Sequence, residues 1–242
     1  MDCGMKISII TVSYRDGANL RRTLRSIDSQ VLPPDVELEN ILVLGDEDEH
    51  IAPEANRKVI YASPKGCYDA MNIGYQASTG NVIGFVDGTN FLWNENVINH
   101  LASVFKNENC DYLYGDVQFM DKDVPNRYYS GARFTPDKLA LGFAPPHPAL
   151  FLSREAMERV GLYSAECGYA ADFEFIVRLV LENSDLHRYY LPECLVGMSV
   201  GGVANSLSAR LWKNTLAKWR ILRQHGVQTS LFKLMLRYLY NN

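Results

Sequence analysis

Residues 59–86 read VIYASPKGCYDAMNIGYQASTGNVIGFV and predict a strand, a helix and a second strand in succession. The first strand is the short β-rich run at residues 59–61, and the second is the apolar run at residues 82–86. Between them, residues 68–77 are typical of a helix that stops at Gly80. A strand–helix–strand order is the unit from which parallel sheets are built.

The same alternation extends on both sides of this stretch. Residues 6–14 (KISIITVSY) and residues 41–44 (ILVL) predict buried strands, and residues 19–30 predict the helix between them. Residues 96–106 predict a further helix. Residues 1–110 therefore predict an α/β fold, with a Rossmann-like, mostly parallel sheet that is flanked by helices on both faces.

The second half lacks this regular alternation and predicts a mixed arrangement. Ser153 is the expected N-cap of one of its helices, and Gly161 is the expected end of that helix. We expect strands at residues 112–120, 149–152 and 189–200, and helices at residues 154–160, 171–181, 207–225 and 230–240.

Length and composition fit one large folded domain. The chain has 242 residues, of which 47% are hydrophobic and 21% are charged, so wholesale disorder is excluded. No apolar run approaches the roughly 20 residues that span a bilayer, and the first residues do not resemble a secretory signal. The five cysteines are scattered, which argues against a disulfide framework or a zinc site and favours a cytoplasmic location.

Charge is distributed unevenly along the chain. Residues 194–242 carry seven Lys and Arg and no acidic residue, which gives this tail a charge of +7. The remaining residues hold 17 basic and 28 acidic side chains, a net charge of −11. A basic tail that interleaves Trp and Leu predicts an anionic membrane surface as partner. The alternative is a solvated helix face, and nucleic acid is disfavoured because the acidic body would repel phosphate.

Several nucleotide-binding and hydrolytic motifs are absent. The sequence has no Gly-x-Gly-x-x-Gly after the first strand, no P-loop and no Gly-x-Ser-x-Gly elbow, and its five histidines lack metal-ligand spacing. Three of the four predicted strand ends instead offer aspartates, in residues 14–16, 45–46 and 87–90. Ligands of such sheets bind at these ends, and carboxylates hold a hard divalent cation that can in turn hold a diphosphate.

The order of several motifs resembles that of the family 2 glycosyltransferases of the GT-A fold. The likeness is greatest to bacterial exopolysaccharide enzymes, including the colanic-acid glycosyltransferases, and it runs over residues 5–205. The motifs that carry it are ISIITVSYR (7–15), GCYDAMNIG (66–74), FVDGTN (85–90), HPALF (147–151), YAADFEF (169–175) and VGGVA (200–204).

The resemblance implies an inverting transfer from a nucleotide-diphosphate sugar to a saccharide acceptor. Relatives act on lipid-linked sugars at the inner face of the membrane, so the implied acceptor is lipid-linked. Residues 1–110 would be the nucleotide-sugar-binding half and residues 111–205 the acceptor and catalytic half of a domain spanning residues 1–205. Residues 206–242 would form basic amphipathic C-terminal helices. The implied activity belongs to polysaccharide biosynthesis in the cytoplasm, with the protein peripheral to the membrane.

The resemblance also implies roles for individual residues. Asp172 would be the general base, and Mg²⁺ or Mn²⁺ would bind at Asp87 and Asn90. The implied acceptor or diphosphate contacts are His147, Tyr169, Gly201 and Gly202. The implied donor-binding residues are Thr11, Ser13, Tyr14, Arg15, Asp46, Asp69, Asn72 and Asp87.

Each of these assignments has a structural alternative. Asp172 would serve equally as a helix N-cap, and Asp87 would serve as part of a plain turn. Asp69 would stabilise the first turn of its helix through the helix dipole. A single histidine such as His147 is more often structural than functional.

Two sites depart from the family pattern, the nucleoside site and the metal motif. Leu44 stands where the second strand of the family usually ends in an aspartate that holds the nucleoside, and Asp46 would have to substitute for it. Thr89 and Asn90 replace more acidic residues of the metal motif, so metal affinity should fall. These departures keep a second hypothesis open, namely a degenerate relative that binds a nucleotide sugar or a protein partner without catalysis.

Overall fold

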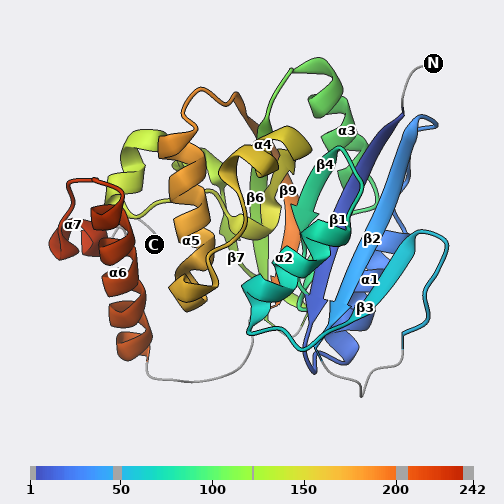
Figure 1. Cartoon of the computed structure of the whole chain (residues 1–242), viewed down its shortest axis with the longest axis horizontal. Helices are drawn as coiled ribbons and strands as arrows, with labels where there is room; N and C mark the ends of the chain where they lie inside the picture. Colours follow the sequence, from blue (N-terminus) through green and yellow to red (C-terminus); the bar gives the residue numbers. More distant parts are fainter. Residues whose placement is uncertain (1–3, 46–50, 122, 200–206, 237–242) are drawn as a thin grey trace.

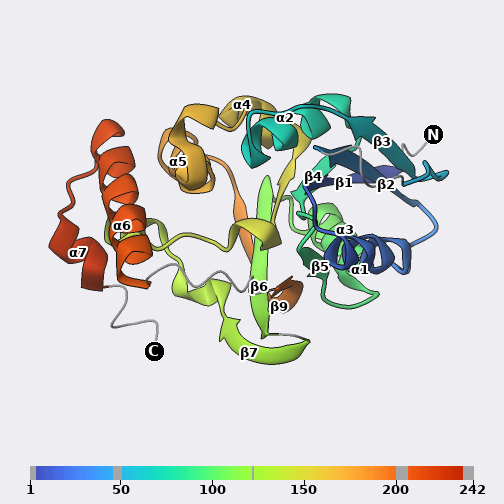
Figure 2. The ribbon, with the colours of Figure 1, turned by 90° about the horizontal axis from the view of Figure 1, so that it is seen from below.

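The computed structural model describes residues 4–45, 51–121, 123–199 and 207–236. Its strands form one nine-stranded sheet in the order β3-β2-β1-β4-β8-β6-β9-β5, with β7 paired to β6. Helices cover both faces of this sheet: α2, α4 and α5 lie on one side, and α1 and α3 lie on the other (Figure 2). Helices α6 and α7 stand at one end of the molecule, far from β3 (Figure 1).

The first half has the predicted parallel arrangement. β1 pairs in parallel with both β2 and β4, and β2 pairs in parallel with β3. β1, β2 and β4 are largely buried because helices cover both faces of the sheet. In chain order the elements are β1 (Met5–Ser13), α1 (Ala18–Asp28), β2 (Val36–Leu44), β3 (Arg57–Tyr61), α2 (Cys67–Ala77) and β4 (Val82–Phe85).

The second half is mixed, as predicted. β8 is antiparallel to β4 and β6, whereas β9 is parallel to β6 and antiparallel to β5. The elements are β5 (Asn90–Leu92), α3 (Val97–Asn107), β6 (Tyr112–Asp121), β7 (Val124–Tyr129), β8 (Leu150–Ser153), α4 (Arg154–Val160), α5 (Ala171–Val177), β9 (Arg188–Ser199), α6 (Leu207–Gln224) and α7 (Leu231–Leu236).

The local signals at α4 are confirmed. The Ser153 side chain accepts a hydrogen bond from the Ala156 backbone N–H, and Gly161 follows the helix with φ of 82°. The helix expected over residues 171–181 is present but changes its hydrogen-bonding pattern. Its α-helical part, α5, ends at Val177, and a π-helical segment, Arg178–Glu182, follows directly. A short 3₁₀ helix, η4 (Ala165–Ala170), leads directly into α5.

Two strands were not predicted. β5 has only three residues, too few to show a periodic pattern. β7 is exposed along almost its whole length and contains Pro125, so it lacks the apolar alternation of a half-buried strand. Three further 3₁₀ helices also escaped prediction: η1 (Gly131–Arg133), η2 (Pro136–Leu141) and η3 (His147–Ala149).

Helix α2 packs very close to the sheet. A Cβ atom added at Gly74 would lie 2.4 Å from Ile10 Cγ2 on β1 and 3.3 Å from Val43 Cγ2 on β2. Only glycine allows this approach. The close packing brings the first turn of α2 to the carboxyl ends of the parallel strands, where the candidate site lies.

Candidate functional site

A cavity of about 620 Å³ opens at the carboxyl ends of the parallel strands. Its walls come from the ends of β1 and β2, the segment after β3, the start of α2 and the loop after β4, which is the place where α/β sheets bind ligands. The lining residues are Val12, Ser13, Tyr14, Asp16, Gly45, Ser63, Pro64, Gly66, Cys67, Ala70, Asp87 and Thr89.

Asp16 is held in the wall of this cavity by its neighbours. Its Oδ2 accepts hydrogen bonds from Ser13 Oγ at 2.8 Å and from the Tyr14 backbone N–H at 3.2 Å. A Cβ atom added at Gly88 would lie 2.6 Å from the same oxygen, so the glycine makes room for the carboxylate. Asp16 therefore sits against the loop that carries Asp87. Asp16 follows the first strand in the sequence and is one of the predicted strand-end carboxylates, but no motif assigns it a role.

The loop after β4 organises Asp87. Its Oδ1 accepts hydrogen bonds from the Thr89 backbone N–H at 2.9 Å and from Thr89 Oγ1 at 2.6 Å. Its Oδ2 accepts from Asn90 Nδ2 at 2.8 Å. Asn90 is 1% exposed, and its Oδ1 has no hydrogen-bond partner among the described residues. In this arrangement Asn90 supports Asp87 with its amide nitrogen, and its role as a metal ligand stays a prediction.

The family implies a divalent cation, and the donor set here fits one only in part. Within the described residues, no three His, Cys, Asp or Glu side chains gather in a way that would hold a metal ion. Asp87 and Thr89 both reach the cavity and offer oxygen atoms. Mg²⁺ is commonly held by one or two carboxylates together with substrate phosphates and water. The residues present therefore fit a cation that arrives with a diphosphate, rather than one held by the protein alone.

Asp172 lies in the first turn of α5 and is half-buried. Its Oδ1 accepts a hydrogen bond from the Phe173 backbone N–H at 2.7 Å, and its charge raises the pKa of the nearby Tyr68 hydroxyl of α2. The N-cap position of α5 belongs to Ala170, so the alternative interpretation of Asp172 as the N-cap was wrong. The carboxylate instead faces the start of α2.

Three carboxylates act on the Cys67 thiol at the cavity wall. Burial by the surrounding atoms raises the pKa of Cys67 to about 12, and the charges of Asp87, Asp172 and Asp16 contribute in the same direction. Burial also raises the pKa of the Tyr68 hydroxyl, and the negative charge of Asp172 raises it further. Both groups are therefore neutral at pH 7. Cys67 and Tyr68 lie inside the GCYDAMNIG motif, which was the signal that could have identified them.

His147 is buried near Asp172 and Asp87. Its Nε2 is 2.7 Å from the hydroxyl of Tyr163, and its ring stacks on Phe85 with centroids 6.2 Å apart. Burial lowers the pKa of His147, whereas the nearby charges of Asp172 and Asp87 raise it and only partly compensate. The imidazole is therefore neutral at pH 7 and close to both aspartates.

Other predicted residues do not line this cavity. Thr11 is 0% exposed and accepts a hydrogen bond from Asn40 Nδ2 at 2.9 Å, so the structure does not bring it to the cavity. Asn72 uses both of its amide atoms on the backbone of Tyr163, at 2.9 Å each. Asp69 Oδ2 accepts from the Lys65 backbone N–H at 2.8 Å, which supports the start of α2.

Tyr14 and Arg15 stand at the mouth of the cavity. The Tyr14 ring is 61% exposed, and the Arg15 guanidinium carbon lies 5.1 Å from the ring centroid. Leu44, at the end of β2, is 2% exposed and belongs to the core, so it offers no polar group to a ligand. Asp46, Gly201 and Gly202 lie outside the described residues.

Comparison with known proteins agrees with this architecture. The family described as "Glycosyl transferase family 2" matches residues 8–156, more than half of the chain. The PGL/p-HBAD biosynthesis glycosyltransferase of Mycobacterium tuberculosis is 26% identical over 210 residues, which cover 83% of this chain and 79% of that protein. An uncharacterized glycosyltransferase of the same species is 27% identical over 184 residues, 72% of this chain and 69% of that protein.

Solved structures share the fold at low sequence identity. Staphylococcus aureus TarS 1–349 in complex with UDP-GlcNAc superposes with a TM-score of 0.68 and 15% identity, over 90% of this chain and 65% of that one. The mannosyltransferase PcManGT from Pyrobaculum calidifontis, in complex with GDP-Man and Mn²⁺, gives 0.62 and 14%, over 97% and 68%.

The fold and the cavity at its strand ends thus define a glycosyltransferase of the GT-A class. The chain belongs to glycosyl transferase family 2, as its motifs predicted.

The buried state of His147 predicts a pH-dependent stability. Because its pKa is below the ordinary value of 6.5, the unfolded chain binds more protons than the folded one as pH falls through that value. The free energy of unfolding should therefore decrease below about pH 6.5, and His147→Gln should weaken this dependence. Urea unfolding between pH 5 and pH 7.5 measures the effect.

The exposed His187 provides the matched control, because His187→Gln should keep the pH dependence of the wild type. Parallel pH profiles for the wild type and His147→Gln would show that His147 does not carry the effect.

Proposed function

We propose that this glycosyltransferase moves one sugar from a nucleoside-diphosphate sugar to a hydroxyl of a saccharide acceptor, with inversion at the anomeric carbon. The observation that supports the proposal is the distribution of carboxylates. Asp16 and Asp87 line the strand-end cavity, and Asp172 of α5 lies close enough to Cys67 and Tyr68 for its charge to raise the pKa of both groups. Asp172 is thus available to the attacking acceptor hydroxyl, and Asp16 and Asp87 are available on the side of the leaving diphosphate.

The proposed reaction needs a base and a stabilised leaving group. Asp172 takes the proton of the acceptor hydroxyl, and the acceptor oxygen forms a bond to the anomeric carbon. The bond from that carbon to the diphosphate oxygen breaks, and its electron pair leaves with the nucleoside diphosphate. Attack from the side opposite the leaving group inverts the configuration.

The donor would occupy the strand-end cavity. Tyr14 offers an exposed aromatic face at its mouth for the nucleobase, with Arg15 beside it, and Ser13 lies deeper in the wall. Asp69 and Asn72 would act by holding α2 and the Tyr163 segment in place. His147, neutral and close to both aspartates, would border the diphosphate or the acceptor.

A divalent cation, Mg²⁺ or Mn²⁺, would neutralise charge on the leaving diphosphate. Asp87 would hold it, with Thr89 nearby. Since the chain supplies few charged ligands, the remaining ligands would be phosphate oxygens and water.

Nucleotide binding should therefore depend on the cation and on Asp87. One of UDP, GDP, CDP and dTDP, with Mn²⁺, should stabilise the protein by about 2.7 kcal/mol at a hundred times its dissociation constant. The shift should be largely lost without Mn²⁺ and in Asp87→Asn. Thermal unfolding measures it, and the exposed Glu37→Gln, remote from the cavity, is the matched control.

Absence of any shift with all four nucleotides would favour the degenerate relative that binds a protein partner. The buried Leu44 at the end of β2 is the observation that keeps this second candidate in view.

Replacing the proposed base should abolish transfer but not donor binding. Asp172→Asn should lower the turnover rate by roughly 10²- to 10⁴-fold, the usual contribution of a general base, while the nucleotide-dependent stabilisation persists. Release of nucleoside diphosphate from the donor, with a lipid-linked saccharide fraction as acceptor, measures the rate. Asp185→Asn changes an exposed aspartate that pairs with Arg159 and serves as control. Undiminished turnover of Asp172→Asn would overturn the assignment.

The acceptor would be lipid-linked and reached at the cytoplasmic face of the membrane. No helix in the described part of the chain combines the length and the apolarity needed to cross a bilayer. Helix α6 instead presents residues 212, 216, 220 and 223 at helical spacing, which places one Trp, one Leu and two Arg on one face, whereas Trp219 packs against the core. The opposite face is buried through Thr215 and Leu222.

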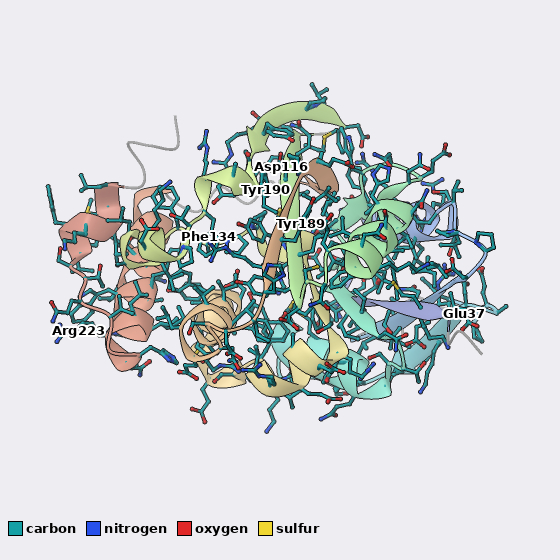
Figure 3. The ribbon with its side chains drawn as sticks, turned by 90° about the horizontal axis from the view of Figure 1, so that it is seen from above. Glu37, Asp116, Phe134, Tyr189, Tyr190 and Arg223 are labelled. Atoms are coloured by element: carbon teal, nitrogen blue, oxygen red, sulfur yellow. The ribbon has the colours of Figure 1, made fainter. Side chains whose placement is uncertain are left out.

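This face of α6 fits an anionic phospholipid surface. Trp212 is 55% exposed, and Phe232 on the adjacent α7 is 73% exposed. Arg220 and Arg223 are also exposed, and Arg223 lies at the outer end of the molecule (Figure 3). Aromatic and basic side chains together are characteristic of interfacial helices.

Removing two positive charges from α6 should weaken vesicle binding. The double variant Arg220→Gln, Arg223→Gln should bind phosphatidylcholine vesicles with about 30% phosphatidylglycerol roughly 30-fold more weakly, since each basic residue contributes about 1 kcal/mol. Cosedimentation measures the affinity. Lys58→Gln combined with Arg159→Gln removes two exposed charges elsewhere and should bind like the wild type. Equal binding by both double variants would contradict the role of α6.

A further inference from the structure

A glycine interrupts the helical path just before the turn that carries Asp172. Gly168, inside η4, has φ of 54° and ψ of −128°, four residues ahead of the aspartate. A Cβ atom added there would meet no atom within 4 Å, so the backbone conformation, and not packing, is what favours glycine at this position. The kink separates residues 169–173 from the first part of η4. Contacts with other elements therefore help to orient this turn.

Helix α6 packs beside α5 and contacts the chain on both sides of Asp172 (Figure 1). On one side, the Tyr169 hydroxyl donates a hydrogen bond to the Lys213 backbone oxygen at 2.7 Å. Tyr169 is 61% exposed, and its role as an acceptor or diphosphate contact stays a prediction. On the other side, the Lys218 ammonium lies 4.2 Å from the centroid of the Phe173 ring. The two contacts thus stand three residues before and one residue after the proposed base.

Phe173 connects the Lys218 contact to the carboxylate. Its ring is buried in the core. Its backbone N–H donates to Asp172 Oδ1 at 2.7 Å, so a rotation of Phe173 would move the donor that orients this oxygen. A cation within about 6 Å of an aromatic ring is attracted to the face of the ring. The Lys218 ammonium therefore opposes such a rotation.

Lys218 is itself held in place. It belongs to the buried face of α6, at helical spacing from Thr215 and Leu222. Its Nζ also donates a hydrogen bond at 3.0 Å to the backbone oxygen of Gly142, the residue that ends η2. The ammonium thus joins α6, η2 and the first turn of α5 at one point.

We propose that Lys218 is a positioning residue for Asp172, and that α6, through Lys218 and the contact to Tyr169, holds this carboxylate in the orientation used for proton transfer. The inference rests on the proposed function, in which Asp172 is the base. A base acts only when it is within hydrogen-bonding reach of the proton that it takes. The described lining of the donor cavity contains no residue of α6. Loss of these contacts should therefore slow transfer and leave donor binding intact.

Replacing Lys218 separates turnover from binding. Lys218→Met keeps the aliphatic length and removes the charge, and it should lower kcat about 10- to 100-fold, since a misplacement of about 1 Å can cost about 100-fold. The KM for the nucleotide sugar should stay within about twofold, because donor binding is unchanged. The assay is release of nucleoside diphosphate from UDP-glucose, UDP-N-acetylglucosamine or GDP-mannose. A lipid-linked saccharide fraction in neutral detergent is the acceptor, so that binding to an anionic membrane does not contribute.

Two variants are matched to Lys218→Met. Lys218→Arg keeps a cation that stacks on the Phe173 ring, and it should restore most of the wild-type kcat. Lys213→Met removes an exposed charge from the same helix and leaves the backbone oxygen that accepts from Tyr169, so it should keep the wild-type kcat. A kcat of Lys218→Met equal to that of Lys213→Met would overturn the proposal.

Backbone hydrogen exchange measures the same contact without any substrate. In Lys218→Met, peptides that cover residues 165–177 should exchange faster than in the wild type, because the first turn of α5 opens more often. The same peptides should exchange as in the wild type in Lys213→Met and nearly so in Lys218→Arg. Equal exchange in the wild type and Lys218→Met would show that the ammonium does not hold the turn.

Tyr169→Phe keeps the proposal testable if Lys218→Met fails to fold, because it removes one hydroxyl and keeps the ring. It should speed exchange over residues 165–177 and lower kcat several-fold, with an unchanged KM for the nucleotide sugar. In that case, unchanged exchange and unchanged kcat would contradict the role of α6.

Asp172→Asn, measured beside these variants, separates failure of this inference from failure of the proposed function. If Asp172→Asn loses turnover while Lys218→Met keeps the wild-type kcat, the transferase proposal stands and the positioning role is wrong. If Asp172→Asn keeps full turnover, Asp172 is not the base, and the positioning role fails together with that assignment.

Discussion

The close packing of α2 on the sheet is the constraint on which the strand-end cavity depends. Gly74 lets the helix approach β1 so closely that a single added Cβ would lie 2.4 Å from Ile10 Cγ2. At the other end of the same helix, Cys67 lines the cavity at the carboxyl ends of the strands, and Tyr68 follows it in the first turn. A helix displaced outward by the width of a methyl group would move both of these residues away from Asp172. The geometry of the site is thus set by a contact in the core.

The carboxylates of the site repel one another, and local hydrogen bonds hold each of them in place. Asp16 is held by Ser13 and the Tyr14 backbone, and Asp87 is held by Thr89 and Asn90. Burial raises the pKa of the Cys67 thiol to about 12, and the charges of Asp87, Asp172 and Asp16 add to this effect. Such a cavity disfavours a diphosphate by itself, because like charges would meet at short range. A cation between the two groups would remove this conflict, which supports the proposal that the site binds metal and nucleotide together.

Much of the fold was predictable because its signals are local. The strands at residues 6–14, 41–44 and 82–86 are apolar runs bounded by turn residues, and the cap at Ser153 depends on a contact only three residues along the chain. β5 and β7 escaped prediction because a three-residue strand has no period and an exposed strand has no apolar face. Their positions are determined by pairing with β9 and β6, which are distant or irregular partners that local patterns do not encode.

The sequence by itself determined the class of the fold, the family and the chain positions of Asp87 and Asp172, because these depend on short motifs in a set order. Only the tertiary structure decided which side chains face the ligand. Thr11 and Ser13 lie two residues apart on β1, yet Asn40 covers the first while the second reaches Asp16. Asn72 meets the backbone of Tyr163 across 91 residues, and Tyr68 meets Asp172 across a similar span. Contacts of this range arise from the packing of whole elements, and neither composition nor spacing specifies them.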